Sequence, residues 1–528
     1  MEHLELVVFG LLVAIATLAV LARVIGVPYP ITLVLGGSVI GFVPGLPDIE
    51  LDPELVLLIF LPPLLYGAAF FSSPRDLRRN ARPIALLSIG LVLLTMLAVA
   101  AVAHEVIGLS WPVAFVLGAV VSPTDAVAPA EIMRRLGTPR RLLTVVEGEN
   151  LTNDWTALVL YSFAVAAVVS GSFSLAEAGL KFVVSGVGGL LVGLAAGWVI
   201  RQVRSRIDDP PTEITISLLS GYAAYLPAEE LGLSGVIAAV TVGLSMGWHT
   251  PQLTTPIMRI QGVSVWEILT FLLNAVLFLL VGLQLPTVAE DISGHSPGQL
   301  LGWGLIVSAV VVGVRLAWQF TVPYLIRAID RRPSQVIRRA DWRSRLVIGW
   351  AGMRGSVSLA AALAIPVETD AGAAFPERDL VILLAFGVIL VTLVGQGLTL
   401  GPLVDRLGLD EDDGQEGREE LEARIRLALA ALERIEELDG EEWVRPDTME
   451  RMRGMFDYRR RRFEAGASED GDGDGFEERT AAYQRLMFEV FDAQREALLG
   501  LRNSGAISDE VRRRVERELD LEETRLGS

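Results

Sequence analysis

The chain has 528 residues, of which 52% are hydrophobic, and a mean hydropathy of +0.47, which indicates a membrane protein with many spans rather than a soluble domain. The absence of cysteine excludes disulfides, thiolate metal sites and cysteine nucleophiles, and the net charge of −18 argues against nucleic-acid binding. The single lysine, Lys181, does not lie in a glycine-rich P-loop frame, so an ATPase of that type is excluded as well.

Thirteen apolar segments are about long enough to cross a hydrocarbon core of about 30 Å. They are predicted at residues 4–23, 29–45, 53–72, 83–106, 111–133, 141–170, 174–200, 211–226, 232–247, 264–285, 298–326, 343–366 and 379–405. Residues 1–5 are acidic rather than basic, so we expect the first segment to be a retained helix and not a cleaved signal peptide. The expected fold class is all-α and polytopic, with the membrane domain over residues 1–407.

The loops between these segments alternate in charge. Arginines occur in every second loop, at residues 23, 75–82, 134–141, 201–206, 259 and 327–345, and the other loops are acidic or neutral apart from Arg378. The positive-inside rule therefore predicts an amino terminus outside and a carboxyl terminus in the cytoplasm. An odd number of spans is needed, and thirteen satisfies this. We expect a multi-pass protein of the cytoplasmic membrane.

Two of the segments are predicted to be interrupted helices. The fifth contains Pro123 and Pro129 on either side of Thr124 and Asp125, and proline removes a backbone donor and strains the preceding turn. The twelfth contains Arg354 between two glycines, at residues 352 and 355. Interrupted spans that enter from opposite sides in corresponding halves of a chain are typical of inverted repeats with an ion site at the membrane midplane.

The sixth segment carries Glu147, Glu149, Asn153 and Asp154 in an otherwise apolar run. An acid at the centre of a membrane helix costs about 2.5 to 3.5 kcal/mol on insertion scales, which favours a functional role over an ordinary buried salt bridge. At about 100° per residue, Asn153 shares the face of Glu149, whereas Asp154 is turned about 140° away and shares the face of Glu147. The two faces are therefore expected to have different roles.

Four ionisable groups from four segments lie at a similar predicted depth: Asp125, Asp154, Arg315 and Arg354. Each is 9 to 13 residues from the nearest arginine of a basic loop, which is about 14 to 20 Å at about 1.5 Å per residue. Unrelated salt bridges would not share a depth. With Glu149 included, three acids face two arginines, and the one surplus negative charge suits one proton or one monovalent cation.

After residue 407 the composition changes sharply. Residues 409–528 hold 34 acidic residues and 20 arginines, a net charge of −14. Helical periodicity predicts an acidic, soluble, cytoplasmic helical tail over residues 408–528. Its Asp/Gly run at residues 468–475 lacks the glutamate of a calcium-binding loop and is interpreted as a solvated linker.

Five motifs together resemble a known family. They read SPTDAVAPAEIMRRLGTPRRL, VEGENLTNDWTALVLY, GLSGVIAAVTVGL, LLNAVLFLLVGLQLP and WAGMRGSVSLAAALAIP. In order and spacing they are similar to the bacterial sodium/proton antiporters of the monovalent cation:proton antiporter-1 family, over residues 1–407. The resemblance implies a homodimer, a mobile core with two crossed interrupted helices, and one-for-one exchange without a cofactor.

The resemblance also implies roles for individual residues. Asn153 and Asp154 match the family's Asn-Asp pair, which makes Asp154 the carrier carboxylate that binds Na⁺ or a proton. Thr124 and Asp125 match the site on the interrupted helix. Glu147 is expected in the cytoplasmic funnel that leads to it.

A buried ion pair is implied next to this site. Glu149 matches the acid that pairs with an arginine, with Arg315 the better candidate and Arg354 the alternative. The chain departs from the family pattern at two places. Asn150 stands where serine is common, so a hydroxyl ligand is replaced by a bulkier amide, and we count Asn150 among the cation-binding candidates. Gly67 stands where many members carry an acid.

The expected function is electroneutral exchange of one Na⁺ for one proton, with no enzymatic chemistry. Its partners are expected to be Na⁺, with Li⁺ or K⁺ as further candidates, together with H⁺ and membrane lipid. One alternative keeps the mechanism with K⁺ as the physiological ion. A cation channel is an alternative from another class, and it would show unitary currents without proton coupling. A membrane sensor that signals through the tail would have no use for acids and arginines at one depth.

Overall fold

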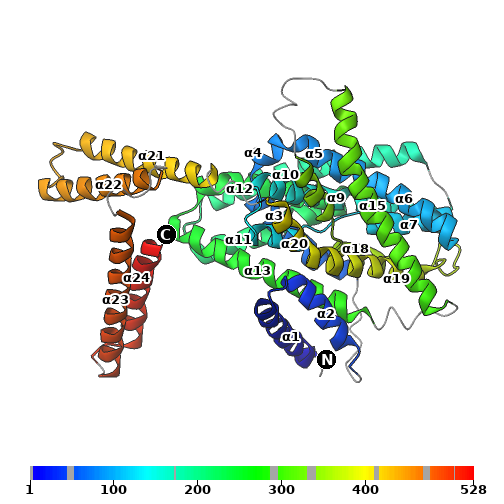
Figure 1. The fold of residues 1–528 in the computed structure, drawn as a ribbon, viewed down its shortest axis with the longest axis horizontal. Helices are drawn as coiled ribbons and strands as arrows, with labels where there is room; N and C mark the ends of the chain where they lie inside the picture. The colour runs from blue at the N-terminus through cyan, green and yellow to red at the C-terminus, as the bar shows by residue number, and fades with distance from the viewer. Residues whose placement is uncertain are drawn as a thin grey trace. The chain divides into compact units, whose positions relative to one another are not determined.

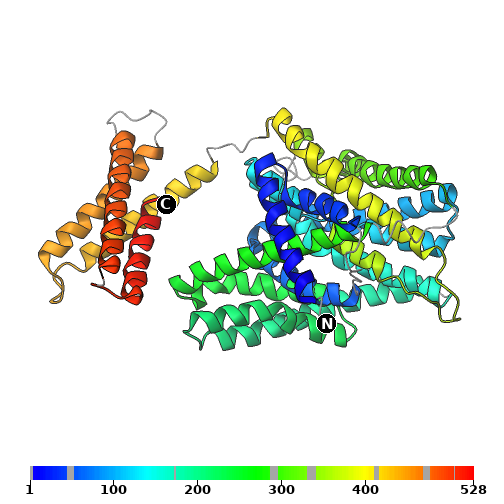
Figure 2. The same ribbon diagram turned by 90° about the horizontal axis from the view of Figure 1, so that it is seen from below.

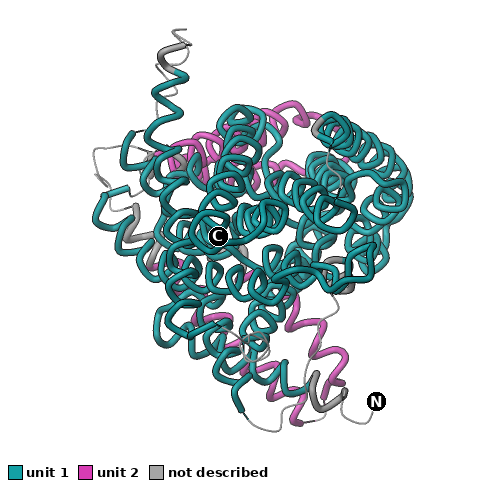
Figure 3. Tube along the Cα trace, turned by 90° about the vertical axis from the view of Figure 1, so that its right-hand side faces the viewer, with its two compact units in different colours: residues 1–411 teal, residues 412–528 magenta. Residues whose placement is uncertain are grey.

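The computed structural model describes residues 4–43, 53–171, 174–285, 295–329, 341–409, 415–467, 476–504 and 506–527. Within these ranges the chain is helical almost throughout and forms no β-strand longer than an isolated bridge. Two compact units are present, residues 1–411 and residues 412–528 (Figure 3). The all-α fold class predicted from the sequence is confirmed.

The first unit contains the apolar helices. In chain order these are α1 (Leu4–Ile25), α2 (Tyr29–Gly41), α3 (Pro53–Phe71), α4 (Pro74–Arg79), α5 (Ala81–Ala85), η1 (Leu86–Leu91), α6 (Val92–Val102), η2 (Ala103–Ile107), α7 (Trp111–Val121), α8 (Val127–Arg135), α9 (Arg140–Val169), α10 (Leu175–Arg204), α11 (Pro210–Glu230), α12 (Gly235–Leu253), α13 (Pro256–Leu283), α15 (Pro297–Ile329), α17 (Trp342–Trp350), α18 (Ser356–Leu363), α19 (Arg378–Leu390), η3 (Val391–Gln396) and α20 (Gly397–Leu407). Among the described residues, six helices are long and apolar enough to cross a membrane, and shorter apolar helices accompany them. The total of thirteen spans stays a prediction.

One helix begins earlier than the sequence analysis predicts. The tenth apolar segment is expected from residue 264, but α13 begins at Pro256. The Thr255 hydroxyl accepts a hydrogen bond from the Met258 N–H at 3.4 Å, and proline is favourable in the first turn of a helix. Hydropathy misses this polar first part of the helix, whereas its capping residues mark it.

The helices of the first unit form two groups. In one, α13 packs against α1 and α2, α3 packs against α11 and α12, and α10 packs against α12 (Figures 1 and 2). In the other, α9 packs against α7 and η1, and α15 packs against α6, α17 and α19. The four ionisable groups predicted to share a depth all lie in the second group.

Glycines on α10 allow this helix to pack closely against α12. A Cβ atom at Gly193 would lie 2.6 Å from the carbonyl oxygen of Ala238 on α12, which is closer than real contacts allow. Gly189 faces the Ser234 carbonyl in the same way. The face of α10 that carries Gly189 and Gly193 thus packs against α12 of the same chain.

Arg378, the exception to the charge pattern of the loops, has a structural role. Its Nε donates to the carbonyl oxygen of Ile365 at 2.9 Å, and its Nη2 donates to that of Leu363 at 3.2 Å. These carbonyls lie at the carboxyl-terminal end of α18, where helical carbonyls lack intrahelical partners. The position of this arginine is therefore explained by capping rather than by membrane topology.

The second unit consists of two helical hairpins. α21 (Gln415–Glu437) packs against α22 (Pro446–Ala467), and α23 (Phe476–Asn503) packs against α24 (Asp509–Gly527). Arg495 on α23 forms ion pairs with Asp520, at 2.8 Å, and with Glu523 on α24. Residues 468–475, for which we predict a solvated linker, lie outside the described residues.

Candidate ion-binding site

The two interrupted helices meet at their non-helical segments. α7 ends at Val121 and α8 begins at Val127, while α17 ends at Trp350 and α18 begins at Ser356. Both interruptions predicted from the sequence are therefore present. Pro129 is not part of the first one, because it lies in the first turn of α8, where a missing N–H has no helical partner to lose.

Glycine allows the two segments to cross closely. The N–H of Asp125 donates to the carbonyl oxygen of Met353 at 2.8 Å. A Cβ atom at Gly355 would overlap the Asp125 carboxylate, so any other residue there would push the segments apart. Gly355 is thus needed for close approach and not only for breaking the helix.

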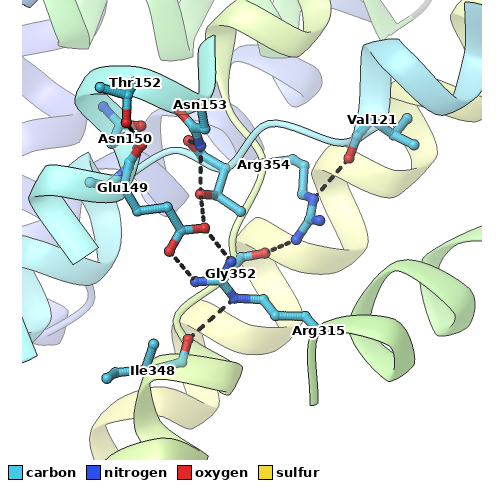
Figure 4. A network of polar contacts seen from close by, with 11 residues as sticks. Val121, Glu149, Asn150, Thr152, Asn153, Arg315, Ile348, Gly352 and Arg354 are labelled. Atoms are coloured by element: carbon cyan, nitrogen blue, oxygen red, sulfur yellow. Dashed lines mark hydrogen bonds and ion pairs between the residues drawn. The ribbon is translucent and has the colours of Figure 1, made fainter. Parts of the chain in front are cut away.

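Glu149 on α9 and Arg315 on α15 form a buried, two-pronged ion pair (Figure 4). Nη1 of Arg315 lies 2.5 Å from Oε1 of Glu149, and Nη2 lies 2.8 Å from Oε2. The glutamate side chain is 2% exposed and the arginine side chain 1%. The Thr124 hydroxyl also donates to Oε1, at 3.1 Å, and Nε of Arg315 donates to the Ile348 carbonyl, so the charges are well satisfied.

Arg354 contacts no carboxylate among the described residues. Its Nε donates to the carbonyl oxygen of Val121 at 3.0 Å, and Nη1 donates to that of Gly352 (Figure 4). No acid lies within ion-pair distance of this buried guanidinium in the described part of the chain. Its positive charge instead faces the carboxyl-terminal end of α7, the negative end of the helix dipole. Of the two arginines considered for Glu149, the structure brings only Arg315 to it.

Asp125 caps a helix. Its Oδ1 accepts the N–H of Val127 at 2.8 Å, at the start of α8. The count of three acids against two arginines leads to the expectation that an arginine balances Asp125 as well as Glu149. This expectation is wrong, because no arginine of the described residues forms an ion pair with Asp125, and the amino-terminal end of α8 compensates its charge instead. The preceding N–H, that of Ala126, donates to Oδ1 of Asn150 at 3.2 Å. The total charge of the site is unchanged by these assignments.

Asn153 holds the interrupted segment in place. Its Nδ2 donates to the carbonyl oxygen of Thr124 at 3.0 Å and to the Thr124 hydroxyl at 2.9 Å (Figure 4). The residue is fully buried and does not line the cavity described next. Thr124 therefore links Asn153 to Glu149, on the same face of α9.

Asp154 occupies the other face of α9 and lines a cavity of about 1750 Å³. It is 4% exposed, and its carboxylate accepts no hydrogen bond from any residue within the described ranges. Asp125, Asn150 and Glu147 line the same cavity, which extends to residues of the arginine-rich side. Glu147 forms an ion pair with Arg134. A buried carboxylate that lines a cavity and has no partner among the described residues is available to bind a cation or a proton.

Sequence reasoning missed several polar residues that line this cavity: Glu131 on α8 and Glu267, Thr270 and Asn274 on α13. The signal for the last three was their spacing of three and four residues, which puts them on one face of a helix. They were overlooked because only charges near the midplane were weighed.

The fold and the site define a polytopic helical membrane protein in which a buried carboxylate, Asp154, shares a cavity with Asp125 at the crossing of two interrupted helices. Residues 10–406 match the family described as sodium/hydrogen exchanger, transmembrane. The chain belongs to this family. Its members are transporters, and the antiporter class predicted from the motifs is confirmed.

Relatives of known description agree with this. A Mycobacterium bovis protein described as an uncharacterized Na⁺/H⁺ exchanger is 39% identical over 98% of this chain and 96% of its own length. The Na⁺/H⁺ antiporter ApNhaP of Aphanothece halophytica is 35% identical over 78% of this chain and 77% of its own. A Bacillus pumilus sodium, potassium, lithium and rubidium/H⁺ antiporter is 34% identical over 74% of this chain and 60% of its own.

A solved structure shares the fold. The sodium proton antiporter MjNhaP1 from Methanocaldococcus jannaschii at pH 8 superposes with a TM-score of 0.59 at 21% identity, over 78% of this chain and 100% of its own. This likeness supports the arrangement of helices in the first unit.

Proposed function

We propose that the protein is a secondary-active Na⁺/H⁺ antiporter of the cytoplasmic membrane that exchanges one Na⁺ for one proton at Asp154. One observation carries this proposal: Asp154 is a buried carboxylate that faces a cavity and has no partner within the described residues, whereas the nearby Glu149 is fully satisfied by Arg315 and Thr124. A lone buried carboxylate gains from binding either a proton or a cation, and the two compete for it.

The surrounding residues have supporting roles in this mechanism. Asp125 lines the cavity with Asp154, and its carboxylate accepts a hydrogen bond from the amino-terminal end of α8. Asn150 and Thr124 line the cavity too, and their side-chain oxygen atoms are candidates for further cation ligands. No covalent step is needed. One pH unit is worth about 1.4 kcal/mol, so it can drive a tenfold sodium gradient.

The choice of ion has a specific rival. The Bacillus pumilus relative is named for sodium, potassium, lithium and rubidium, so K⁺ exchange is the second candidate. We expect dequenching of an acridine dye in everted vesicles on addition of Na⁺ or Li⁺, and a weaker response to K⁺, because a smaller cation approaches the carboxylate of Asp154 more closely and is attracted more strongly. A K⁺ response equal to or above the Na⁺ response would establish the rival. Vesicles without the protein serve as the control.

The exchange is expected to be electroneutral. Asp125 and Glu149 are each compensated within the protein, and Asn153 is an amide rather than a second acid, so only Asp154 changes its protonation. A membrane potential shifts an electrogenic cycle by about 2.3 kcal/mol per net charge per 100 mV. A valinomycin-imposed potassium potential should therefore not drive Na⁺ uptake into proteoliposomes at matched pH.

The same potassium gradient without valinomycin controls for direct K⁺ exchange. Sustained uptake that requires valinomycin would show that a second group titrates, and Asp125 would be the first suspect. In that case the one-for-one stoichiometry would be wrong, although antiport itself would stand.

We also propose a homodimer with its amino terminus outside and its carboxyl terminus in the cytoplasm. The alternation of arginine-rich loops supports this orientation. The exposed apolar face of α10, which includes Val183, Val187, Leu190 and Leu194, is available to lipid or to a second copy.

A further inference from the structure

Three polar side chains run along one face of the apolar part of helix α13: Glu267, Thr270 and Asn274. Their spacing of three and four residues places them one above another on the helix. All three line the cavity that contains Asp154. We refer to these three residues as the α13 stripe.

The stripe residues have no side-chain partner in the part of the chain that the structure describes. No hydrogen bond or ion pair joins any of the three side chains to another residue within the described ranges. Asn274 is only 4% exposed, and a buried carboxamide without a hydrogen-bond partner is costly unless water or a solute satisfies it. By contrast, Glu147 forms an ion pair with Arg134, and Asn150 accepts the Ala126 N–H. The stripe therefore presents free polar atoms to whatever enters the cavity.

The stripe leads towards Asp154. Glu267 and Asn274 follow Arg259, at the basic end of α13, by 8 and 15 residues, or about 12 and 22 Å along the helix. Asp154 follows Arg141 by 13 residues, or about 20 Å. The stripe thus begins on the arginine-rich side and reaches the level of the carrier carboxylate.

The chemistry of the stripe suits a monovalent cation. A carboxylate, a hydroxyl and a carboxamide all supply oxygen ligands, which hard cations prefer. We infer that the α13 stripe is a second cation subsite: Glu267 attracts the ion, and the oxygens of Thr270 and Asn274 replace part of its water before it reaches Asp154. This inference rests on the proposed function. The subsite lies on the helix group of α13 and α2, and Asp154 lies on the other group.

Substitutions of near-equal volume test the subsite. Thr270→Val and Asn274→Leu remove the oxygens. We expect Asn274→Leu to raise the apparent KM for Na⁺ roughly tenfold, since contacts to a charged group are worth about that factor or more. Thr270→Val should raise it less, and the maximal rate should stay near wild type in both. Ile268→Ala, on the same helix and 62% exposed, is the matched control with an unchanged KM.

Glu267→Gln tests the attraction by charge. Its effect on the KM for Na⁺ should be larger at low ionic strength than at high, because salt screens exposed charges. Purified protein gives a readout besides transport: the Na⁺ concentration that half-saturates thermal stabilisation should rise by the same factor as the KM. If Asn274→Leu fails to fold, as judged by size exclusion, the other two variants carry the test.

The outcomes separate this inference from the proposed function. If Asp154→Asn is inactive while the stripe variants keep the wild-type KM at every ionic strength, the second subsite is overturned and the carrier role of Asp154 stands. If Asp154→Asn transports like wild type, the proposed function itself fails. A rise in KM with an unchanged maximal rate supports the subsite.

Discussion

Replacing Asp154 by asparagine is expected to abolish Na⁺-dependent proton movement, down to the level of vesicles without the protein. The amide has nearly the same size but cannot exchange a proton for a cation. The carboxylate accepts no hydrogen bond from a described residue, so its removal breaks no contact and the variant should fold and insert normally. Dye dequenching in everted vesicles measures the loss, and size exclusion of the purified protein checks the fold.

A matched control is available on the surface. Asp76→Asn removes a carboxylate from an exposed pair with Arg140 on the same side of the protein, and it should leave exchange close to wild type. Retention of more than trace exchange by Asp154→Asn would show that another group carries the ions. Asp125, which lines the same cavity, would then be tested next.

Glu149→Gln should mainly destabilise the protein. The substitution leaves the Arg315 guanidinium, 1% exposed, buried without its counter-charge, and breaking a buried pair in this way typically costs about 3 to 5 kcal/mol. The midpoint of thermal inactivation in detergent should fall clearly below that of wild type. Loss of transport should follow loss of folded protein.

The chain offers a control on the same helix. Glu147→Gln is the same substitution in an ion pair with Arg134, whose side chain is 62% exposed, and exposed pairs are worth about 0 to 1 kcal/mol. A double variant, Glu149→Leu with Arg315→Met, should recover part of the lost stability because no buried charge remains unpaired. Equal midpoints for Glu149→Gln and wild type would contradict the energetic role of this pair.

Local chemistry in the sequence was enough to predict the helices and their interruptions. Proline at residue 123 and the glycines at residues 352 and 355 disfavour a continuous helix in their own segments, so the breaks in the fifth and twelfth segments could be predicted from local sequence. The further role of Gly355 in the close approach of Asp125 could not. The separation of Glu149 from Asp154 likewise follows from helical geometry, and the structure places one at an ion pair and the other at the cavity. The early start of α13 was missed because hydropathy was weighed above capping.

Contacts between distant segments were decided only by the tertiary structure. Arg315 and Arg354 have similar predicted depths. Nothing in the sequence shows that Arg315 pairs with Glu149 whereas Arg354 donates to the carbonyl end of α7. Depth is one coordinate, whereas pairing depends on the direction of each side chain around its helix and on which helices are neighbours.

The composition of the cavity also depends on contacts between distant segments. That the polar face of α13 lies opposite Asp154 depends on how two groups of helices are arranged, and those groups come from separate parts of the chain. By itself the sequence determined the class of protein and its interrupted helices, and it predicted which carboxylate is the carrier. The packing of helices far apart in the chain decided which charges are neutralised and which polar atoms are left to meet an ion, because both depend on neighbours that local sequence does not specify.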